Sequence, residues 1–369
     1  MEEIQEKVKE EEEATEIERN WADLPPELFS VILNKFSEIS DFVRSRAVCK
    51  SWRFSSSVSD LPPQFPWIFE LSNGPDLEFY SIAFNQVYTL HVPCPTAMRF
   101  FGPAGGYLLT GEEDTAGSFS LLNPLNNIEV PLPVVLFCVP YKFALNFSSH
   151  SHLSSQIDNY MLFSEYERSV GCKLGDDRWD IIGPGHECKY RCYYFKGLFF
   201  RVEDSTGVTT VMDISSRKEL YVIQPPKYEH MSKMSFAGPY LVESCGEILN
   251  VCYNQSYKRK NYKFYIYRLE FGNGEGNPCW VKLTSIGDRI LFFDFSYGNG
   301  HGFYLKASDF VGFKGNCIYF INVVIRAFDQ SYNYLIVMYD MENGETVFID
   351  SPFGRFKEIT WFMPTINHI

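Results

Sequence analysis

Hydrophobic residues recur at helical spacing close to the start of the chain. The stretch DLPPELFSVILNKF contains Leu28, Ile32 and Phe36 at intervals of four, with Phe29 and Leu33 beside them. Residues four apart lie on one face of an α-helix. The stretch therefore predicts a helix with one broad apolar stripe.

Two helices are predicted in this region. Asp23 is the expected N-cap of the first, and Pro25 and Pro26 suit its first turn, where a missing N–H group costs nothing. A second helix is predicted from Asp41, as its N-cap, through FVRSRAVCKSW to Trp52. The connecting SEIS is short, so the two helices are expected to pack as neighbours.

After Leu61 the pattern changes to short runs of aromatic and β-branched residues separated by Gly, Pro, Asn and Asp. Such runs include YLLTG, FSLLN, GLFFRV, TTVMD, KFYIYRL, CIYFINVVI and YLIVMYD. Strands of this length with frequent turn signals are typical of a sandwich, a barrel or a propeller. The fold class is therefore mainly β with a small α-helical N-terminal module.

A weak internal repeat favours the propeller. Several strands close on an Asn or acidic residue and then turn into a second strand, at Asn85, Asn123, Glu165, Asp213, Glu270 and Asp340. The successive separations are 38, 42, 48, 57 and 70 residues. Units of about 40 to 50 residues with four short strands are typical of propeller blades. Six markers predict about six blades, and five or seven remain open because the units at Glu165 and Glu270 are weak.

The two ends of this β region are also strand-like. PWIFEL begins it and EITWFMPTI ends it, and both are aromatic. A propeller must close its ring, so we expect these stretches to share or adjoin one blade and so avoid exposed strand edges.

Composition agrees with a packed protein and narrows its partners. Aromatic residues make up 17% of the 369, and the net charge is −13. Residues 2–19 hold nine Glu against three basic residues, which predicts an acidic, disordered tail over 1–19. An acidic chain without a basic stripe is a poor non-specific ligand for nucleic acid. We therefore expect a tail (1–19), a helical module (20–60) and a β domain (61–369), with no nucleic-acid partner.

No apolar stretch near the start reads as a secretory signal, and none later reaches the roughly 18 apolar residues of a membrane-spanning helix. We therefore expect no membrane partner. The ten cysteines are expected to be reduced thiols of a protein in the nucleus, the cytoplasm or both.

The strongest metal candidate is HECKYRC, where His186, Cys188 and Cys192 share a parity, with Cys172 upstream. It lacks the Cys-x-x-Cys spacing usual at zinc sites, so buried core cysteines are the better interpretation. The glycine-rich stretches FGNGEGN and YGNGHG contain no P-loop, and no Gly-x-Ser-x-Gly or His-Glu-x-x-His motif occurs. We predict no metal and no cofactor, and we assign no catalytic residue.

The helical module is too small to hold together well alone, because domains below about 40 residues usually need a metal, a disulfide or a partner. Cys49 is its only cysteine, and it has no histidine. Its apolar stripe must therefore pack on the following domain or on another protein, and physical reasoning leaves both open.

The residues of this module resemble an F-box, the module that docks F-box proteins onto the Skp adaptor of a Skp–cullin–F-box ubiquitin ligase. The resemblance rests on LPPELFSVIL…F followed by FVRSRAVCKSWR. Phe29, Phe36 and Phe42 stand where leucine or tyrosine is commoner. It implies a Skp-binding surface, and through Skp a cullin partner, made by Leu24, Pro25, Leu28, Ile32, Phe36, Phe42, Arg46, Val48, Cys49 and Trp52.

The remainder, over roughly 65–365, resembles the kelch-like β-propeller of a plant F-box family, the KIB group and its relatives. The phrases that carry this resemblance include FSLLNPL, GPYLVESCGEILNV, SDFVGFKGNCIYF and VMYDMENGE, whereas FFDFSYGNGHGFYLKASDF is unusually aromatic. Together the two resemblances imply a non-catalytic substrate-recognition subunit whose propeller binds an unidentified target protein, through residues that the sequence does not identify. The alternatives are a propeller enzyme or small-molecule binder, and an F-box scaffold that ubiquitinates nothing.

Overall fold

In the computed structural model of the protein, the chain divides into two compact units at the peptide bond between Gln64 and Phe65. The sequence pattern had placed this boundary after residue 60. The structure describes residues 20–57, 60–71, 74–93, 98–104, 106–112, 118–134, 160–165, 168–173, 175–183, 190–227, 236–256, 261–271, 277–295, 301–325, 331–354 and 357–366. The predicted tail, 1–19, lies outside these residues.

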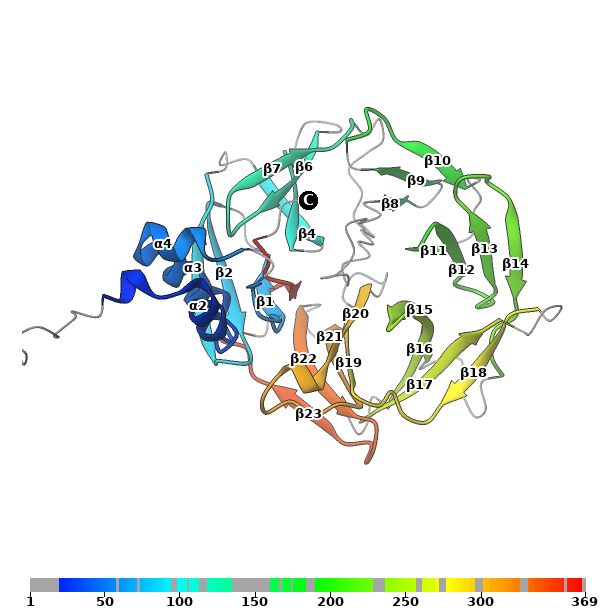
Figure 1. Ribbon diagram of the computed structural model, residues 1–369. Coiled ribbons are helices and arrows are strands. Elements are labelled where there is room, and N and C mark those ends of the chain that lie inside the picture. The colour runs from blue at the N-terminus through cyan, green and yellow to red at the C-terminus, as the bar shows by residue number, and fades with distance from the viewer. Residues whose placement is uncertain are drawn as a thin grey trace, which may run out of the picture. The chain divides into compact units, whose positions relative to one another are not determined.

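The first unit is helical, as predicted, and is drawn in blue in Figure 1. It contains η1 (Trp21–Asp23), α2 (Pro26–Leu33), α3 (Ile39–Val48) and α4 (Lys50–Phe54). The N-cap position of α2 is Pro25 and not Asp23, which lies in the preceding 3-10 turn. Phe36 lies beyond the end of α2, so the predicted stripe is shared between a helix and the loop after it.

The second predicted helix is two helices. The N-cap of α3 is Glu38, three residues before the predicted cap Asp41, and the N–H group of Ile39 donates to Oε1 of Gln64 at 2.9 Å. An acceptor from the far end of the unit therefore serves the start of this helix. At Cys49 the backbone is extended, with φ −153° and ψ 168°, and this residue separates α3 from α4.

The helical unit has a small interior. Phe29, Leu33 and Phe42 are fully buried, and the ring of Phe29 lies 4.5 Å from that of Trp52. The indole N–H group of Trp52 donates to the carbonyl oxygen of Trp21 at 2.9 Å, which ties η1 to α4. None of the helices described is long and apolar enough to cross a lipid bilayer.

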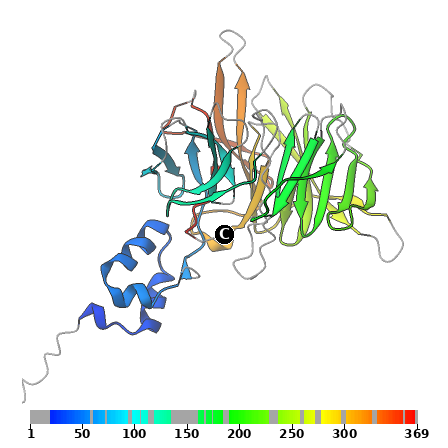
Figure 2. The same ribbon diagram turned by 90° about the horizontal axis from the view of Figure 1, so that it is seen from above.

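The second unit is a propeller whose described strands form six sheets around a ring (Figure 1), which confirms the predicted architecture. Seen from above, the strands run across the ring from one face to the other (Figure 2). The first three sheets are β24-β1-β2-β3, β4-β5-β6-β7 and β10-β9-β8. Their strands are β1 (Trp67–Glu70), β2 (Asp76–Ser81), β3 (Gln86–His91), β4 (Met98–Ala104), β5 (Tyr107–Glu112), β6 (Phe119–Asn123), β7 (Ile128–Pro131), β8 (Tyr160–Glu165), β9 (Arg168–Lys173), β10 (Asp180–Gly183) and β24 (Ile359–Phe362).

The other three sheets are β11-β12-β13-β14, β15-β16-β17-β18 and β20-β19-β21-β22-β23. Their strands are β11 (Tyr190–Phe195), β12 (Leu198–Glu203), β13 (Thr209–Asp213), β14 (Glu219–Ile223), β15 (Phe236–Ser244), β16 (Glu247–Ser256), β17 (Asn261–Glu270), β18 (Cys279–Leu283), β19 (Arg289–Asp294), β20 (His301–Lys306), β21 (Cys317–Ile325), β22 (Tyr332–Asp340) and β23 (Thr346–Ile349). A short turn, η3 (Ala307–Asp309), follows β20.

Five of the six repeat markers end a strand, each in a different sheet, and Asn85 lies in the turn between β2 and β3 of the remaining sheet. The local reason is visible at Asp213 and Asp340, whose carboxylates accept from the N–H groups of Ser216 at 2.6 Å and Glu342 at 2.8 Å. These bonds turn the chain from one strand into the next. Glu165 differs because it ends β8, the strand of its sheet that lies nearest the middle of the ring in Figure 1. Asn123, Asp213 and Glu270 each end the third strand of a four-stranded sheet. Asp340 ends β22, which is the fourth strand in the order of the five-stranded sheet.

The ends of the propeller meet, as predicted. β1 pairs antiparallel with β24, from Trp67 opposite Phe362 to Glu70 opposite Ile359. Trp361 of the closing strand is buried, and its indole N–H group donates to the carbonyl oxygen of Phe293 in a neighbouring sheet at 2.9 Å. The closing strand is therefore held by both backbone pairing and core packing.

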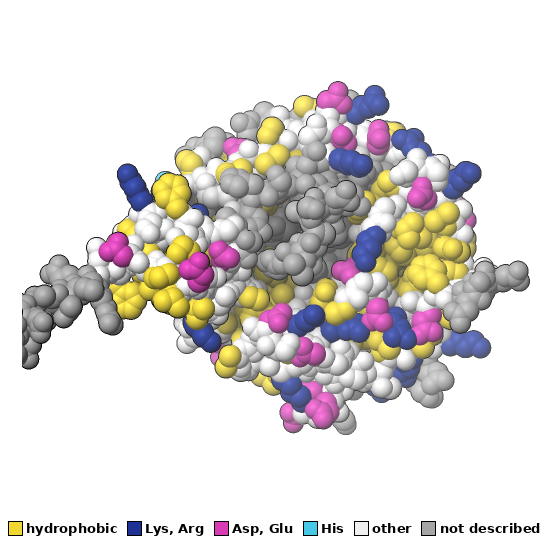
Figure 3. All heavy atoms as spheres, viewed as in Figure 1, with side chains coloured by type: hydrophobic (Ala, Val, Ile, Leu, Met, Phe, Trp, Pro, Cys, Tyr) yellow, Lys and Arg dark blue, Asp and Glu magenta, His cyan; other side chains and the backbone are white. Residues whose placement is uncertain are grey.

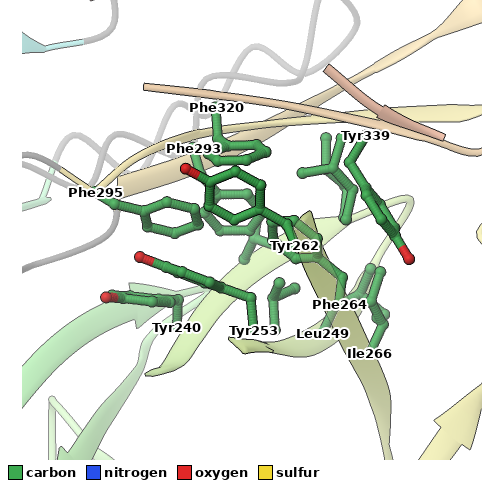
Figure 4. Close-up of a cluster of buried hydrophobic side chains, with 14 of the residues drawn as sticks. Tyr240, Leu249, Tyr253, Tyr262, Phe264, Ile266, Phe293, Phe295, Phe320 and Tyr339 are labelled. Atoms are coloured by element: carbon green, nitrogen blue, oxygen red, sulfur yellow. The ribbon is translucent and has the colours of Figure 1, made fainter. Parts of the chain in front are cut away.

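Aromatic side chains fill the spaces between neighbouring sheets. Figure 4 shows one such cluster, in which Phe293 and Phe320 from one sheet pack beside Tyr240, Tyr253 and Phe264 from the next. The rings meet edge to face, tilted or stacked, and Phe264 and Phe320 lie edge to face at 5.2 Å. The high aromatic content is thus largely used in the core.

The unusually aromatic stretch FFDFSYGNGHGFYLK corresponds to a departure from the regular sheet pattern. It forms the hairpin of β19 and β20, and β19 then pairs in parallel with β21. The sheet consequently has five strands, and β20 contacts β15 of the neighbouring sheet. Sequence spacing did not predict this additional strand.

Candidate protein-docking surface of the helical unit

The helical unit carries many large apolar side chains on its surface. Several are about half exposed or more: Trp21 (68%), Leu28 (54%), Val31 (56%), Val43 (46%), Val48 (64%) and Phe54 (85%). Figure 3 shows hydrophobic side chains on the unit's visible face, beside acidic ones. Exposed apolar side chains on so small a unit make it a candidate docking surface.

The predicted adaptor-binding residues occupy different depths. Pro25, Leu28 and Val48 are exposed. Six others are partly exposed: Leu24, Ile32, Phe36, Arg46, Cys49 and Trp52. Phe42 is fully buried inside the unit, so it supports the surface from beneath and presents no contact area of its own. Its apolar character in the sequence gave no sign of this difference.

Arg46 organises the segment that follows α4. Its Nη1 atom donates to the carbonyl oxygen of Ser56 at 2.7 Å and to Oγ of the same residue at 3.1 Å. Its guanidinium group also lies 5.6 Å from the ring centroid of Phe42. Arg46 thus links the interior of the unit to the chain that leaves it.

Cys49 acts as a local cap. Its Sγ atom accepts a hydrogen bond from the N–H group of Trp52 at 3.4 Å, at the start of α4. The side chain therefore helps to set the direction of α4, and with it the position of Trp52.

Four exposed apolar residues were missed by the sequence pattern: Trp21, Val31, Val43 and Phe54. Val31 lies three residues after Leu28, a spacing that also places two residues on one helix face. The three-residue spacing would therefore have identified Val31. Phe54 has no such signal, because its exposure depends on the break at Cys49.

Comparisons with known proteins place the chain in a family. A family model described as KIB1-4 beta-propeller matches residues 79–348. An F-box/kelch-repeat protein of Arabidopsis thaliana is 35% identical over 366 residues, which cover 91% of this chain and 96% of that protein. The chain belongs to the KIB1-4 β-propeller family of plant F-box proteins. A further Arabidopsis thaliana F-box protein is 24% identical over 347 residues, or 83% of this chain and 97% of that protein.

In the propeller of this F-box protein, the structure describes two of the four residues that the sequence offered as metal candidates. Cys172 and Cys192 are buried on β9 and β11, in different sheets, whereas His186 and Cys188 lie outside the described residues. Burial raises the pKa of the Cys172 thiol to about 12, and Asp176 and Asp180 contribute to that rise. No group of three or more His, Cys, Asp or Glu side chains suited to a metal ion occurs among the described residues.

Arg191 on β11 is a charged residue whose side chain is largely enclosed. Its Nε atom lies 3.4 Å from a carboxylate oxygen of Asp204, and its Nη1 atom donates to the carbonyl oxygen of Pro239 at 3.0 Å. The guanidinium group also lies 4.5 Å from the ring centroid of Tyr240 on β15. These contacts join two neighbouring sheets, so the arrangement is that of a structural tie.

Proposed function

We propose that this protein is the substrate-recognition subunit of a Skp–cullin–F-box ubiquitin ligase. Its F-box binds a Skp-type adaptor and, through it, a cullin. Its propeller binds a target protein and presents that protein for ubiquitination. The proposal places the protein in the nucleus, the cytoplasm or both.

The observation that supports this proposal most directly is the exposed apolar surface of the F-box. Leu28 and Val31 project from α2, whereas Val48 and Phe54 lie at the ends of α3 and α4. Beneath them the unit is packed around Phe42, so the surface has a firm support. Helices with one apolar face suit a groove on a partner protein.

The contribution of such a subunit to the reaction is proximity. A target held on the propeller meets the ubiquitin-loaded enzyme within one assembly, which replaces a bimolecular encounter. No side chain of this chain then has to form or break a covalent bond.

The test is the affinity of the purified full-length chain for a plant Skp adaptor, compared with that of Leu28→Lys. Because Leu28 is half exposed, we expect the variant to fold normally and to bind at least about tenfold more weakly. Val311→Lys is the matched control, since Val311 is a fully exposed apolar residue of the propeller. Equal adaptor binding by the wild type and Leu28→Lys would overturn the proposed docking surface.

A second measurement separates ubiquitination from scaffolding. The assembled complex is tested for ubiquitin transfer to proteins that the propeller retains. Transfer that depends on Leu28 supports the proposal, whereas adaptor binding without any transfer favours an F-box scaffold.

A further inference from the structure

One face of the sheet formed by β15–β18 carries exposed lysine and aromatic side chains that lie outside the core. Side chains alternate between the two faces of a strand, so Lys263, Tyr265 and Leu269 of β17 share one face. Two residues of the adjacent strand β18 belong to the same face, because Lys282 pairs with Tyr267 of β17 and Trp280 pairs with Leu269. Leu269 and Trp280 pack towards the β11–β14 sheet, whereas Lys263 and Lys282 are exposed.

Two positive charges converge on one aromatic ring at one end of this face. The Nζ atoms of Lys263 and Lys282 lie 5.5 Å and 5.9 Å from the ring centroid of Tyr265. Among the described residues, neither lysine has a carboxylate within ion-pair distance. Lys314, by contrast, lies 3.0 Å from a carboxylate oxygen of Asp340 and 2.6 Å from one of Glu342. The two lysines around Tyr265 therefore retain their capacity to bind an anion.

The other end of the face is aromatic and exposed. Phe271, directly after β17, is 52% exposed, and its ring lies 5.7 Å from that of Tyr221 on β14. Tyr221 is itself 37% exposed and belongs to the neighbouring sheet. Two exposed rings in contact offer a place for an apolar side chain of a partner.

The charge of the surroundings distinguishes this face from the rest of the protein. The whole chain has a net charge of −13. The two lysines beside Tyr265 are a local positive charge on this acidic protein. A basic surface attracts acidic partners.

We infer that the lysine–aromatic surface, made by Lys263, Tyr265, Lys282, Phe271 and Tyr221, binds an acidic segment of the target protein. Carboxylates of that segment lie near the two lysines, and an apolar side chain lies against Phe271 and Tyr221. The eight residue steps from Lys263 to Phe271 correspond to roughly 26 Å, so an extended segment of about eight residues reaches from one end to the other. Between these ends Tyr267 and Leu269 are buried and add no contact surface. This inference rests on the proposed function, in which the propeller holds a target.

The test is direct binding of labelled peptides to the full-length protein, measured by fluorescence polarisation. The probe is an extended peptide of about eight residues with a Phe at one end and Glu residues at the other, made in both orders. A second peptide carries Lys in place of each Glu. We expect the acidic probe to bind, the basic one not to bind, and the affinity to fall as salt is added.

Three variants locate the site. Lys263→Glu combined with Lys282→Glu is expected to weaken binding of the acidic probe at least about tenfold, because two attractions become repulsions. Phe271→Ala is expected to weaken it about threefold or more and to leave a probe without Phe unaffected. Lys306→Glu is the matched control, since Lys306 is an exposed lysine of another sheet. It is expected to change the affinity by less than about twofold.

Equal binding of the acidic and basic peptides, unchanged binding by the double variant, or no binding of either acidic probe would overturn the inference. Adaptor binding measured on the same preparations separates the two proposals. Adaptor binding without probe binding overturns the lysine–aromatic surface alone. Probe binding that requires the two lysines, without adaptor binding, supports this surface and overturns the proposed ligase role.

Discussion

Phe54 in the F-box is 85% exposed, whereas Phe320 in the propeller has no exposed surface. Both belong to regular elements of the same chain, and both are large and apolar. The propeller buries its rings because each sheet has a neighbour on either side. The F-box is a few short helices with no second layer of its own, so part of its apolar surface stays at the solvent. Apolar residues therefore stabilise the propeller, and on the F-box they remain available to a partner.

The largest expected loss of stability comes from removing β24, the strand that closes the propeller ring. Deleting residues 359–369 removes β24, including the buried residues Ile359, Trp361 and Phe362, and exposes the edge of β1. We expect the propeller to lose its cooperative thermal transition, measured by calorimetry, because ring closure and core packing are lost together.

The control for this deletion is a chain that lacks only residues 367–369, which lie beyond the described part of the structure. It is expected to melt as the full chain does. A cooperative transition at the same temperature after deletion of 359–369 would contradict the role of β24 in closing the ring.

A matched pair of substitutions tests the comparison directly. Phe320→Ala is expected to lower the free energy of unfolding by about 3–5 kcal/mol, because it empties a buried aromatic site. Phe54→Ala is expected to change it by less than about 0.5 kcal/mol, since the ring is already in water. Urea unfolding of both variants gives the two values, and adaptor binding is expected to weaken only for Phe54→Ala. Similar losses of stability in the two variants would show that Phe54 packs against another part of the chain.

The smallest effect is a loss of stability at alkaline pH caused by buried tyrosines. This contribution belongs to the propeller alone, since residues 1–64 contain no tyrosine. Burial raises the pKa of Tyr319 from 10.0 to about 12, and Cys317 adds to the rise. In the unfolded chain this phenol ionises near its ordinary pKa, whereas the folded protein keeps its proton to higher pH. The folded state then binds more protons, so the free energy of unfolding falls as the pH rises from about 10 to about 12.

The contribution of Tyr319 to this fall is about 1 kcal/mol after allowance for solvent screening. Denaturant unfolding at several pH values below and above the ordinary tyrosine pKa measures it. Tyr319→Phe should show a shallower loss of stability over that range than the wild type. Identical slopes for the two proteins would contradict the assignment.

Much of the propeller could be predicted because its signals are local and repeated. The carboxylates of Asp213 and Asp340 bond to N–H groups two or three residues later, so the turn is encoded where it occurs. The pairing of β1 with β24 followed from the need to close a ring. The fifth strand of the β19–β23 sheet could not be predicted in this way. β19 pairs in parallel with β21, and β20 and η3 lie between these two strands in the chain.

The F-box surface shows the same division. Leu28 and Val48 were predicted at the surface and are exposed, and their contact with an adaptor stays a prediction. Phe42 has the same apolar character in the same module, yet it is inside. The difference comes from the packing of α2, α3 and α4 against one another, and residue type alone carries no information about it.

The amino-acid sequence by itself determined the helical module, the repeated strand–turn units and the aromatic ends that close the ring, because these depend on spacing and on turns between neighbouring residues. Tertiary structure decided the cap of α3 by Gln64, the burial of Phe42 and the meeting of Lys263 and Lys282 at Tyr265. Each of these depends on residues that are distant in the chain and adjacent only after folding.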